Sequence, residues 1–168
     1  MWNKGLSYRE RHGILNMDTK QNEATSSTID KAKYNNSLGL VFFPAFDWKI
    51  SETHPERQER LLYTRDQIVE EGLLDIPNIR EYNPIVADWD TIERVHVGAP
   101  DLESWVTEAH RVSAGGAIAA ADAVMRGEVD RAFALVRPPG HHAMAMVHGI
   151  RGFCTINIEA VMIQHMRQ

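Results

Sequence analysis

This 168-residue sequence has few of the features that direct a protein to a membrane, to nucleic acid or to an oxidising compartment. A single cysteine, Cys154, excludes a disulfide within the chain and fits a reducing compartment. No apolar run approaches the roughly 20 residues that span a bilayer, and residues 1–16 lack the apolar core of a secretory signal. The net charge of −5 offers no basic surface for nucleic acid or acidic lipid. We therefore expect a cytoplasmic protein with neither nucleic-acid nor membrane partners.

The chain divides into a polar beginning and a globular remainder. Residues 1–37 are rich in Asn, Ser, Thr and Lys and have few large apolar side chains, so burial would not offset the entropy of ordering them. Over the whole chain, 43% hydrophobic and 24% charged residues are ordinary for a globular protein of one domain. We predict a disordered polar leader over 1–37 and an α/β domain over 38–168.

Within that domain, short apolar strands alternate with helical segments. The strands are expected at 40–43, 79–82 and 131–136. Thr53 and Glu56 have the spacing of a capping box, which predicts a helix over 55–71. Further helices are expected after Asp88, over the Ala- and Gly-rich stretch 114–126, and over 156–168. The alternation favours a three-layer α/β fold with a mainly parallel sheet.

The segment Arg-Pro-Pro-Gly-His-His-Ala, residues 137–143, is the most informative in the chain. It follows the carboxyl end of the strand 131–136, where open α/β sheets place their ligand crevices. The prolines stiffen the backbone, and Gly140 permits a turn or close approach that a Cβ would block. His141 and His142 present two imidazoles that exchange protons near neutral pH, which suits general acid–base chemistry on a polarised carbonyl.

Taken alone, this pattern leaves several interpretations open. Adjacent histidines in a loop are most often surface or structural residues, and His142 with His148 has the spacing of a metal pair. No Asp-x-His or Cys-x-x-Cys stretch accompanies them in the sequence. Phe153 alone is typical of an ordinary core aromatic.

The surrounding motifs narrow these alternatives. Residues 134–143, Ala-Leu-Val-Arg-Pro-Pro-Gly-His-His-Ala, followed by Gly152-Phe153-Cys154, resemble the signature loop of the histone deacetylase, acetoin-utilization and acetylpolyamine amidohydrolase superfamily. His-Pro-Glu-Arg at 54–57, Arg-Val-His at 94–96 and Gly-Gly at 115–116 agree with that family in order and spacing. The resemblance runs from about Gly39 to the last residue and implies the arginase- and deacetylase-like three-layer fold.

The same resemblance implies an activity and the residues that carry it. Members are zinc-dependent hydrolases of amide bonds in acetyl-lysine or acetylpolyamine-type substrates. By resemblance, His141 and His142 stand beside a zinc-bound water, one as general base and the other helping to protonate the leaving amine. Gly152 and Phe153 are implied to line the tunnel that holds the acylated stem, where an aromatic ring packs along a methylene chain.

The resemblance also implies residues that this sequence does not contain. The family holds zinc with two aspartates and one histidine, two of these ligands coming from an Asp-x-His stretch, and no Asp-x-His occurs in the 168 residues. We therefore assign no metal ligands, expect zinc to bind weakly, and predict a truncated, amino-terminal part of the domain that is inactive by itself. Three explanations remain: a fragment of a complete deacetylase, a catalytically inactive binding module, or a partner of a second polypeptide that supplies the zinc half.

Association with another chain is the final expectation. In a complete family member the strand 131–136 is expected to be central, so in this chain one of its edges would lack a partner. That strand has no charge or proline between residues 132 and 136 to discourage pairing. We expect a homo-oligomer, association with a complementary chain, or aggregation, unless the terminal helix at 156–168 or the polar leader folds over the edge.

Overall fold

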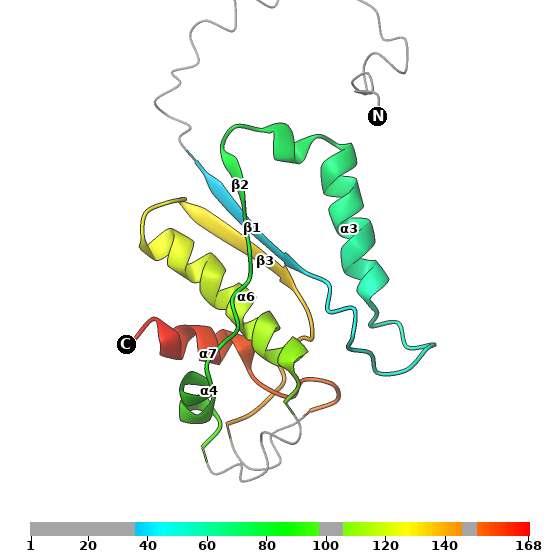
Figure 1. Ribbon diagram of the computed structural model, residues 1–168, viewed down its shortest axis with the longest axis vertical. Coiled ribbons are helices and arrows are strands. Elements are labelled where there is room, and N and C mark those ends of the chain that lie inside the picture. The colour runs from blue at the N-terminus through cyan, green and yellow to red at the C-terminus, as the bar shows by residue number, and fades with distance from the viewer. Residues whose placement is uncertain (1–35, 98–105, 146–150) are drawn as a thin grey trace, which may run out of the picture. The chain divides into compact units, whose positions relative to one another are not determined.

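The structure is a computed structural model that describes residues 36–97, 106–145 and 151–168 (Figure 1). The predicted leader at 1–37 lies outside these residues except for its last two, and His148 lies outside them as well. The elements follow in the order β1 (Leu38–Phe43), α3 (Gln58–Glu70), the 3-10 helix η3 (Leu73–Asp75), β2 (Ile79–Tyr82), α4 (Trp89–Val95), α6 (Glu108–Met125), β3 (Arg131–Val136) and α7 (Ile158–His165).

The three strands form one parallel sheet in the order β2-β1-β3. Leu38, at the start of the central strand, pairs with Ile79 on one side and with Arg131 on the other. The boundaries of β2 and β3 are those predicted from the apolar runs, and β1 begins two residues earlier than expected. The prediction of an α/β fold with a parallel sheet is confirmed.

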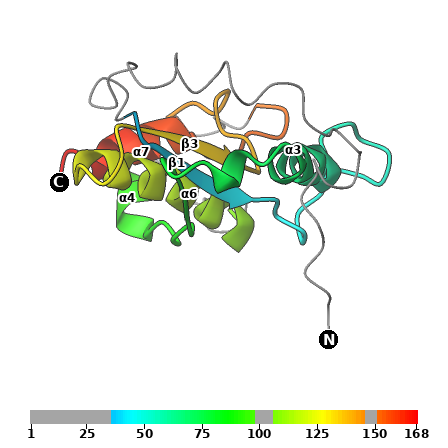
Figure 2. The ribbon, with the colours of Figure 1, turned by 90° about the horizontal axis from the view of Figure 1, so that it is seen from above.

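Helix α6 packs along one face of this sheet, and α3 contacts the other face at Phe42. A Cβ on Gly116 of α6 would lie 2.7 Å from the Val136 side chain, so the helix contacts that face closely. On the other face, the Arg65 guanidinium of α3 lies 5.3 Å from the ring centroid of Phe42, whose partner in the register is Leu135. Successive residues of a strand point to opposite faces, so Phe42 lies on the face away from α6, where Phe133 is exposed. In Figure 2, α6 lies below the strands and α3 lies at the right.

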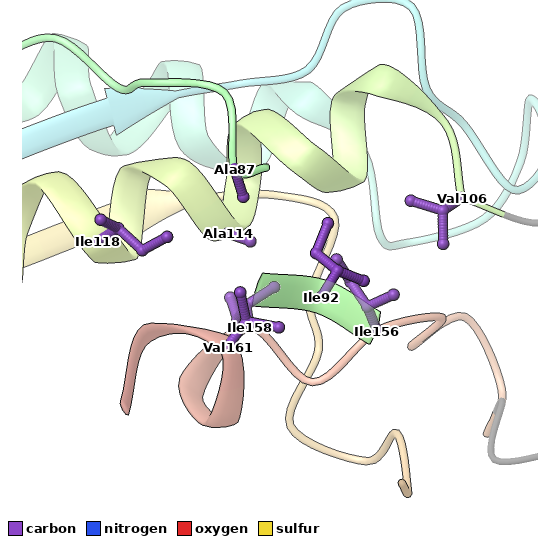
Figure 3. Close-up of a cluster of buried hydrophobic side chains, with 8 residues drawn as sticks. All are labelled: Ala87, Ile92, Val106, Ala114, Ile118, Ile156, Ile158 and Val161. Carbon is purple, nitrogen blue, oxygen red and sulfur yellow. The ribbon is translucent and has the colours of Figure 1, made fainter. Parts of the chain in front are cut away.

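The hydrophobic core lies where α4, α6 and α7 meet (Figure 3). Ile92, Ile118 and Val161 are at most 1% exposed, and Ile156 from the segment before α7 joins them with no exposed area. The cluster comprises Ala87, Ile92, Val106, Ala114, Ile118, Ile156, Ile158 and Val161. The close packing expected from the small residues of α6 is present, because a Cβ on Gly115 would fall only 1.9 Å from the carbonyl oxygen of Ile85.

The predicted capping box before α3 is wrong. The helix begins at Gln58 with Arg57 as its N-cap, and no side chain caps it. Glu56, which was expected to reach back to the backbone near Thr53, is instead bound by Arg137 from the end of β3. A long-range ion pair thus takes the carboxylate that the local pattern assigned to the cap.

Two other helix boundaries differ from the prediction. The helix expected over 114–126 begins at Glu108, because the backbone N–H of Thr107 donates to Nδ1 of His110 at 3.1 Å and stabilises an earlier first turn. The helix expected over 156–168 begins at Ile158, with the side chain of Asn157 as its N-cap. Among the described residues, no helix combines the length and the apolar character needed to cross a bilayer.

Candidate active site

The loop that carries the histidines is anchored by a buried arginine at its root. Arg137 is 1% exposed, and its Nε donates to Oε1 of Glu56 at 2.9 Å. Its Nη1 donates to the carbonyl oxygens of Pro44 at 2.7 Å and Ala45 at 2.9 Å, while its guanidinium lies 5.0 Å from the ring centroid of Trp48. The carboxyl ends of β1 and β3 are therefore fixed to each other by one side chain.

Beyond this root, the chain turns tightly and presents the two histidines. The N–H of Ala143 donates to the carbonyl of Gly140 at 3.0 Å. A Cβ on Gly140 would lie 2.3 Å from the carbonyl oxygen of Ile156, so only glycine allows the loop to approach the segment before α7. His141 and His142 are exposed, with ring centroids 4.0 Å apart and ring planes inclined by 58°.

His96 is hydrogen-bonded both to the histidine loop and to the segment before α7. Its side chain is 4% exposed, its Nδ1 lies 3.1 Å from the carbonyl oxygen of Met144, and its Nε2 lies 2.9 Å from the backbone N–H of Asn157. Because a carbonyl only accepts and an N–H only donates, the imidazole must be neutral, with its proton on Nδ1. Burial lowers the pKa of His96 and favours this neutral form, against a smaller opposing effect of the bond to Met144.

Asn157 completes this support. Its Nδ2 donates to the carbonyl of Ala143 at 2.9 Å, and its Oδ1 accepts from the N–H of Ala160 at 2.9 Å at the start of α7. The histidine loop, α7 and His96 therefore converge on a single asparagine. Neither His96 nor Asn157 was predicted as a site residue, although the Arg-Val-His stretch at 94–96 was one of the family motifs.

The predicted tunnel residues lie in a second turn, residues 151–154, before α7. Arg151 and Cys154 form an isolated antiparallel bridge, and Gly152 between them has a φ of 59°. The ring of Phe153 contacts that of His54 edge-on, with centroids 5.2 Å apart and an interplanar angle of 74°. Since Nδ1 of His54 accepts from the N–H of Glu56 at 3.0 Å, its Nε2 carries the proton. His54 thus extends the aromatic wall that Phe153 begins, which the sequence did not show.

The second turn also brings the single cysteine to the histidines. Cys154 is 1% exposed, and its Sγ lies with one ring nitrogen each of His141 and His142 in a group whose members are all within 4.8 Å of one another. No sequence motif indicated this grouping, because a cysteine twelve residues beyond His142 matches no metal-binding spacing.

Known proteins resemble this chain in sequence and in fold. Residues 101–168 match the family described as histone deacetylase domain. A probable deacetylase of Archaeoglobus fulgidus is 37% identical over 145 residues, covering 75% of this chain and 40% of its own length. The polyamine deacetylase HDAC10 of Mus musculus is 28% identical over 144 residues, covering 72% of this chain and 21% of its own length. The crystal structure of the HDA15 HD domain superposes with a TM-score of 0.62 at 24% identity, covering 76% of this chain and 42% of that chain, which supports the fold.

The chain belongs to the histone deacetylase superfamily. This confirms the resemblance seen in the motifs, and the shared fold confirms the three-layer deacetylase-like architecture. The chain spans less than half the length of these relatives. The described residues include the paired histidines and the Gly-Phe turn, the two motifs on which the resemblance to histone deacetylases rests.

The donor set of this chain does not fit the zinc site of histone deacetylases. The resemblance implies two aspartates and a histidine, of which the Asp-x-His pair is absent from the sequence. Across residues 36–97, 106–145 and 151–168, one group of three or more His, Cys, Asp or Glu side chains has the proximity to hold a metal, and it contains no carboxylate. That group consists of His141, His142 and Cys154, so it includes the two residues to which the resemblance assigns proton transfer.

Proposed function

We propose that this chain supplies the histidine half of a deacetylase site that hydrolyses amides of the acetyl-lysine or acetylpolyamine type. The observation that carries the proposal is the position of His141 and His142. They lie at the carboxyl end of β3, exposed at the tip of a loop whose root, Arg137, is buried and ion-paired. Similarity to proteins named as a probable deacetylase and as a polyamine deacetylase supports the same reaction class.

In the proposed reaction the two imidazoles transfer protons at the scissile amide. One takes a proton from the attacking water, and the other gives a proton to the leaving nitrogen, so that the amine departs neutral. The contact between their rings keeps both groups on one side of the loop. Activation of the carbonyl requires metal ligands that this sequence does not contain, so we expect no turnover from the isolated chain.

The aromatic wall formed by His54 and Phe153 suits the stem of such a substrate. A lysine or polyamine stem is a methylene chain, and aromatic faces bury methylene groups while excluding water. The free Nε2–H of His54 is an added polar contact on an otherwise apolar wall. The single cysteine fits a reducing compartment, so we propose that this chemistry takes place in the cytoplasm.

The structure also suggests how a complementary segment would join. No strand pairs with the outer edge of β3 in the part of the chain that the structure describes. A groove of about 430 Å³ runs along that edge, lined mainly by apolar side chains of α6, β3 and α7. On the opposite face of β3, Phe133 is 54% exposed. We propose that a further parallel strand pairs with β3 and carries the metal ligands to the histidines.

Complementation tests the function. The purified chain should show no deacetylation of an acetyl-lysine peptide or an acetylpolyamine, whereas joining it to the carboxyl-terminal portion of a full-length relative should give chelator-sensitive turnover. His142→Ala should remove most of that turnover, and His165→Ala on α7 is the matched control that should not. Turnover by the chain alone would contradict its dependence on added ligands. A folded but inactive fusion that still binds acetyl-lysine peptide would instead favour an inactive binding module.

Light scattering tests the open edge. At about tens of micromolar, where transient association of exposed edges is expected, the isolated chain should form oligomers. Phe133→Lys should reduce this association, because it places a charge beside the unpaired edge. Tyr63→Lys on α3, where the side chain is 69% exposed, is the matched control. A stable monomer at that concentration would contradict docking along β3.

A further inference from the structure

The fold gathers three metal-binding side chains from two separate turns. His141 and His142 come from the loop after β3, and Cys154 comes from the turn before α7. Their ligand atoms lie within 4.8 Å of one another. The Arg151–Cys154 bridge, with backbone hydrogen bonds of 3.2 and 3.0 Å, holds the cysteine in place, and the buried Ile156 fixes the segment that follows.

The donor atoms of this group have no competing hydrogen bonds. Within residues 36–97, 106–145 and 151–168, neither the ring nitrogens of His141 and His142 nor the thiol of Cys154 makes a side-chain hydrogen bond. Their lone pairs are therefore free to bind a ligand. His96 and Asn157 differ, because the polar atoms of their side chains are hydrogen-bonded to backbone groups.

We propose that His141, His142 and Cys154 form a metal site of their own, distinct from the zinc site of the family. Two imidazoles and one thiolate suit Zn²⁺ or another divalent ion of similar softness, and they leave a fourth position open. Two nitrogens and one sulfur around tetrahedral zinc lie roughly 3.3 to 3.5 Å apart. The ligand atoms of this group, which lie within 4.8 Å of one another, must therefore close by up to about 1.5 Å, which the exposed histidine rings achieve by rotating about their side-chain bonds. The thiol loses its proton to solvent when the metal binds.

This site has a consequence that rests on the proposed function. An imidazole nitrogen that binds a metal cannot accept a proton from water, so an ion held here removes the two proton carriers from catalysis. The metal site and the deacetylase site therefore exclude each other. Excess Zn²⁺ should inhibit a complemented enzyme by occupying the histidines, and the thiolate strengthens that hold.

Cobalt spectroscopy tests the site directly, because Cys154 is the chain's only cysteine and any thiolate signal reports on it alone. Titration of the purified chain with Co²⁺ should saturate at one equivalent with a thiolate-to-cobalt charge-transfer band in the near ultraviolet. Zn²⁺ should bleach the band by displacement and should protect the thiol from alkylation. A chain without that band, or with a thiol that alkylates equally fast with and without Zn²⁺, would overturn the metal site.

Variants sharpen the assignment. Cys154→Ser should abolish the band, and His141→Ala or His142→Ala should weaken cobalt binding at least tenfold, whereas His165→Ala should leave it unchanged. Because both histidines are exposed, their removal should not unfold the chain, which thermal melting by circular dichroism checks. Undiminished cobalt binding by both histidine variants would also overturn the site. In the complemented enzyme, Cys154→Ser should raise the Zn²⁺ concentration that inhibits; unchanged inhibition would overturn the antagonism alone.

Discussion

Arg137 and His142 are five residues apart on one loop, yet their surroundings are opposite. The guanidinium of Arg137 is buried, ion-paired with Glu56 and bonded to two carbonyl oxygens. The imidazole of His142 is exposed and makes no hydrogen bond in the described part of the chain. The root of this loop, at Arg137, therefore provides rigidity, and its tip, at His141 and His142, keeps free lone pairs. Substitutions at the root should therefore cost stability, and substitutions at the tip should cost chemistry.

Breaking the root should have the largest effect. Arg137→Met leaves the carboxylate of Glu56 buried without its main partner, so we expect a loss of about 3–5 kcal/mol in the free energy of unfolding. Arg60→Met is the matched control: it removes the other arginine that binds Glu56, but that side chain is 59% exposed and should contribute at most about 1 kcal/mol. Urea denaturation followed by circular dichroism measures both. Equal losses would show that Arg137 is no special anchor.

The turn between root and tip should come next. Gly140→Ala drives a Cβ into the carbonyl of Ile156, and overpacking of this kind costs about 1–3 kcal/mol. Gly127→Ala provides the comparison, because Gly127 has a φ of 68° but a Cβ added there would have no neighbouring atom within 4 Å. It should lose about 1 kcal/mol from backbone conformation alone. The same denaturation experiment distinguishes them, and a larger loss at Gly127 would argue against the close approach.

Removing the side chain of His96, which supports the histidine loop, should lower the free energy of unfolding somewhat less. His96→Ala leaves the N–H of Asn157 and the carbonyl of Met144 without a partner, at about 2 kcal/mol in total. Activity of the complemented enzyme should fall as well, because the histidine loop loses its fixed position. Phe153→Leu should lower activity without this loss of stability, so the pair separates positioning from substrate contact.

Acid should weaken the same support. The unfolded chain protonates its histidines near pH 6.5, whereas burial lowers the pKa of His96 in the folded state. Below pH 6.5 the unfolded state therefore binds more protons, and stability falls as the pH is lowered. His110, whose pKa burial lowers to about 4, acts in the same direction. Urea denaturation at pH 7 and pH 5 should show a smaller difference for His96→Asn than for the unaltered chain.

The tip itself should matter least for stability. His142→Ala removes an exposed side chain without a hydrogen bond, so the free energy of unfolding should change by no more than about 0.5 kcal/mol. The same variant should lose most of the turnover of the complemented enzyme. A loss of stability comparable to that of Arg137→Met would contradict the division between root and tip.

The sequence predicted the parts of the molecule that depend on local pattern. The strands at 79–82 and 131–136 have the expected ends, because apolar runs bounded by turn residues mark buried strands. Asp88 caps α4 as expected, with its side chain accepting from the N–H of Thr91. The family motifs indicated the histidines and the Gly-Phe pair, and the structure brings the two segments together through Cys154.

What the sequence missed depends on contacts between distant residues. Glu56 leaves its expected cap because Arg137, 81 residues later, binds it. His96 lies 61 residues before Asn157, so no local spacing indicates their hydrogen bond. Cys154 seemed isolated because its neighbours in space come from another turn. In each case a side chain is recruited across the fold, which propensity and periodicity do not describe.

The parallel pairing of β1 has a consequence for how the protein is made. The residues just before β1 and β3 are hydrogen-bonded to each other, although they are far apart in sequence. The N–H of Ser37 donates to the carboxylate of Asp130, 93 residues later. During synthesis β1 leaves the ribosome long before β3, and until then only β2 is available to it. The closure of such a loop is entropically costly and slow. The Glu56–Arg137 pair and the histidine turn therefore cannot form before β3 docks on β1.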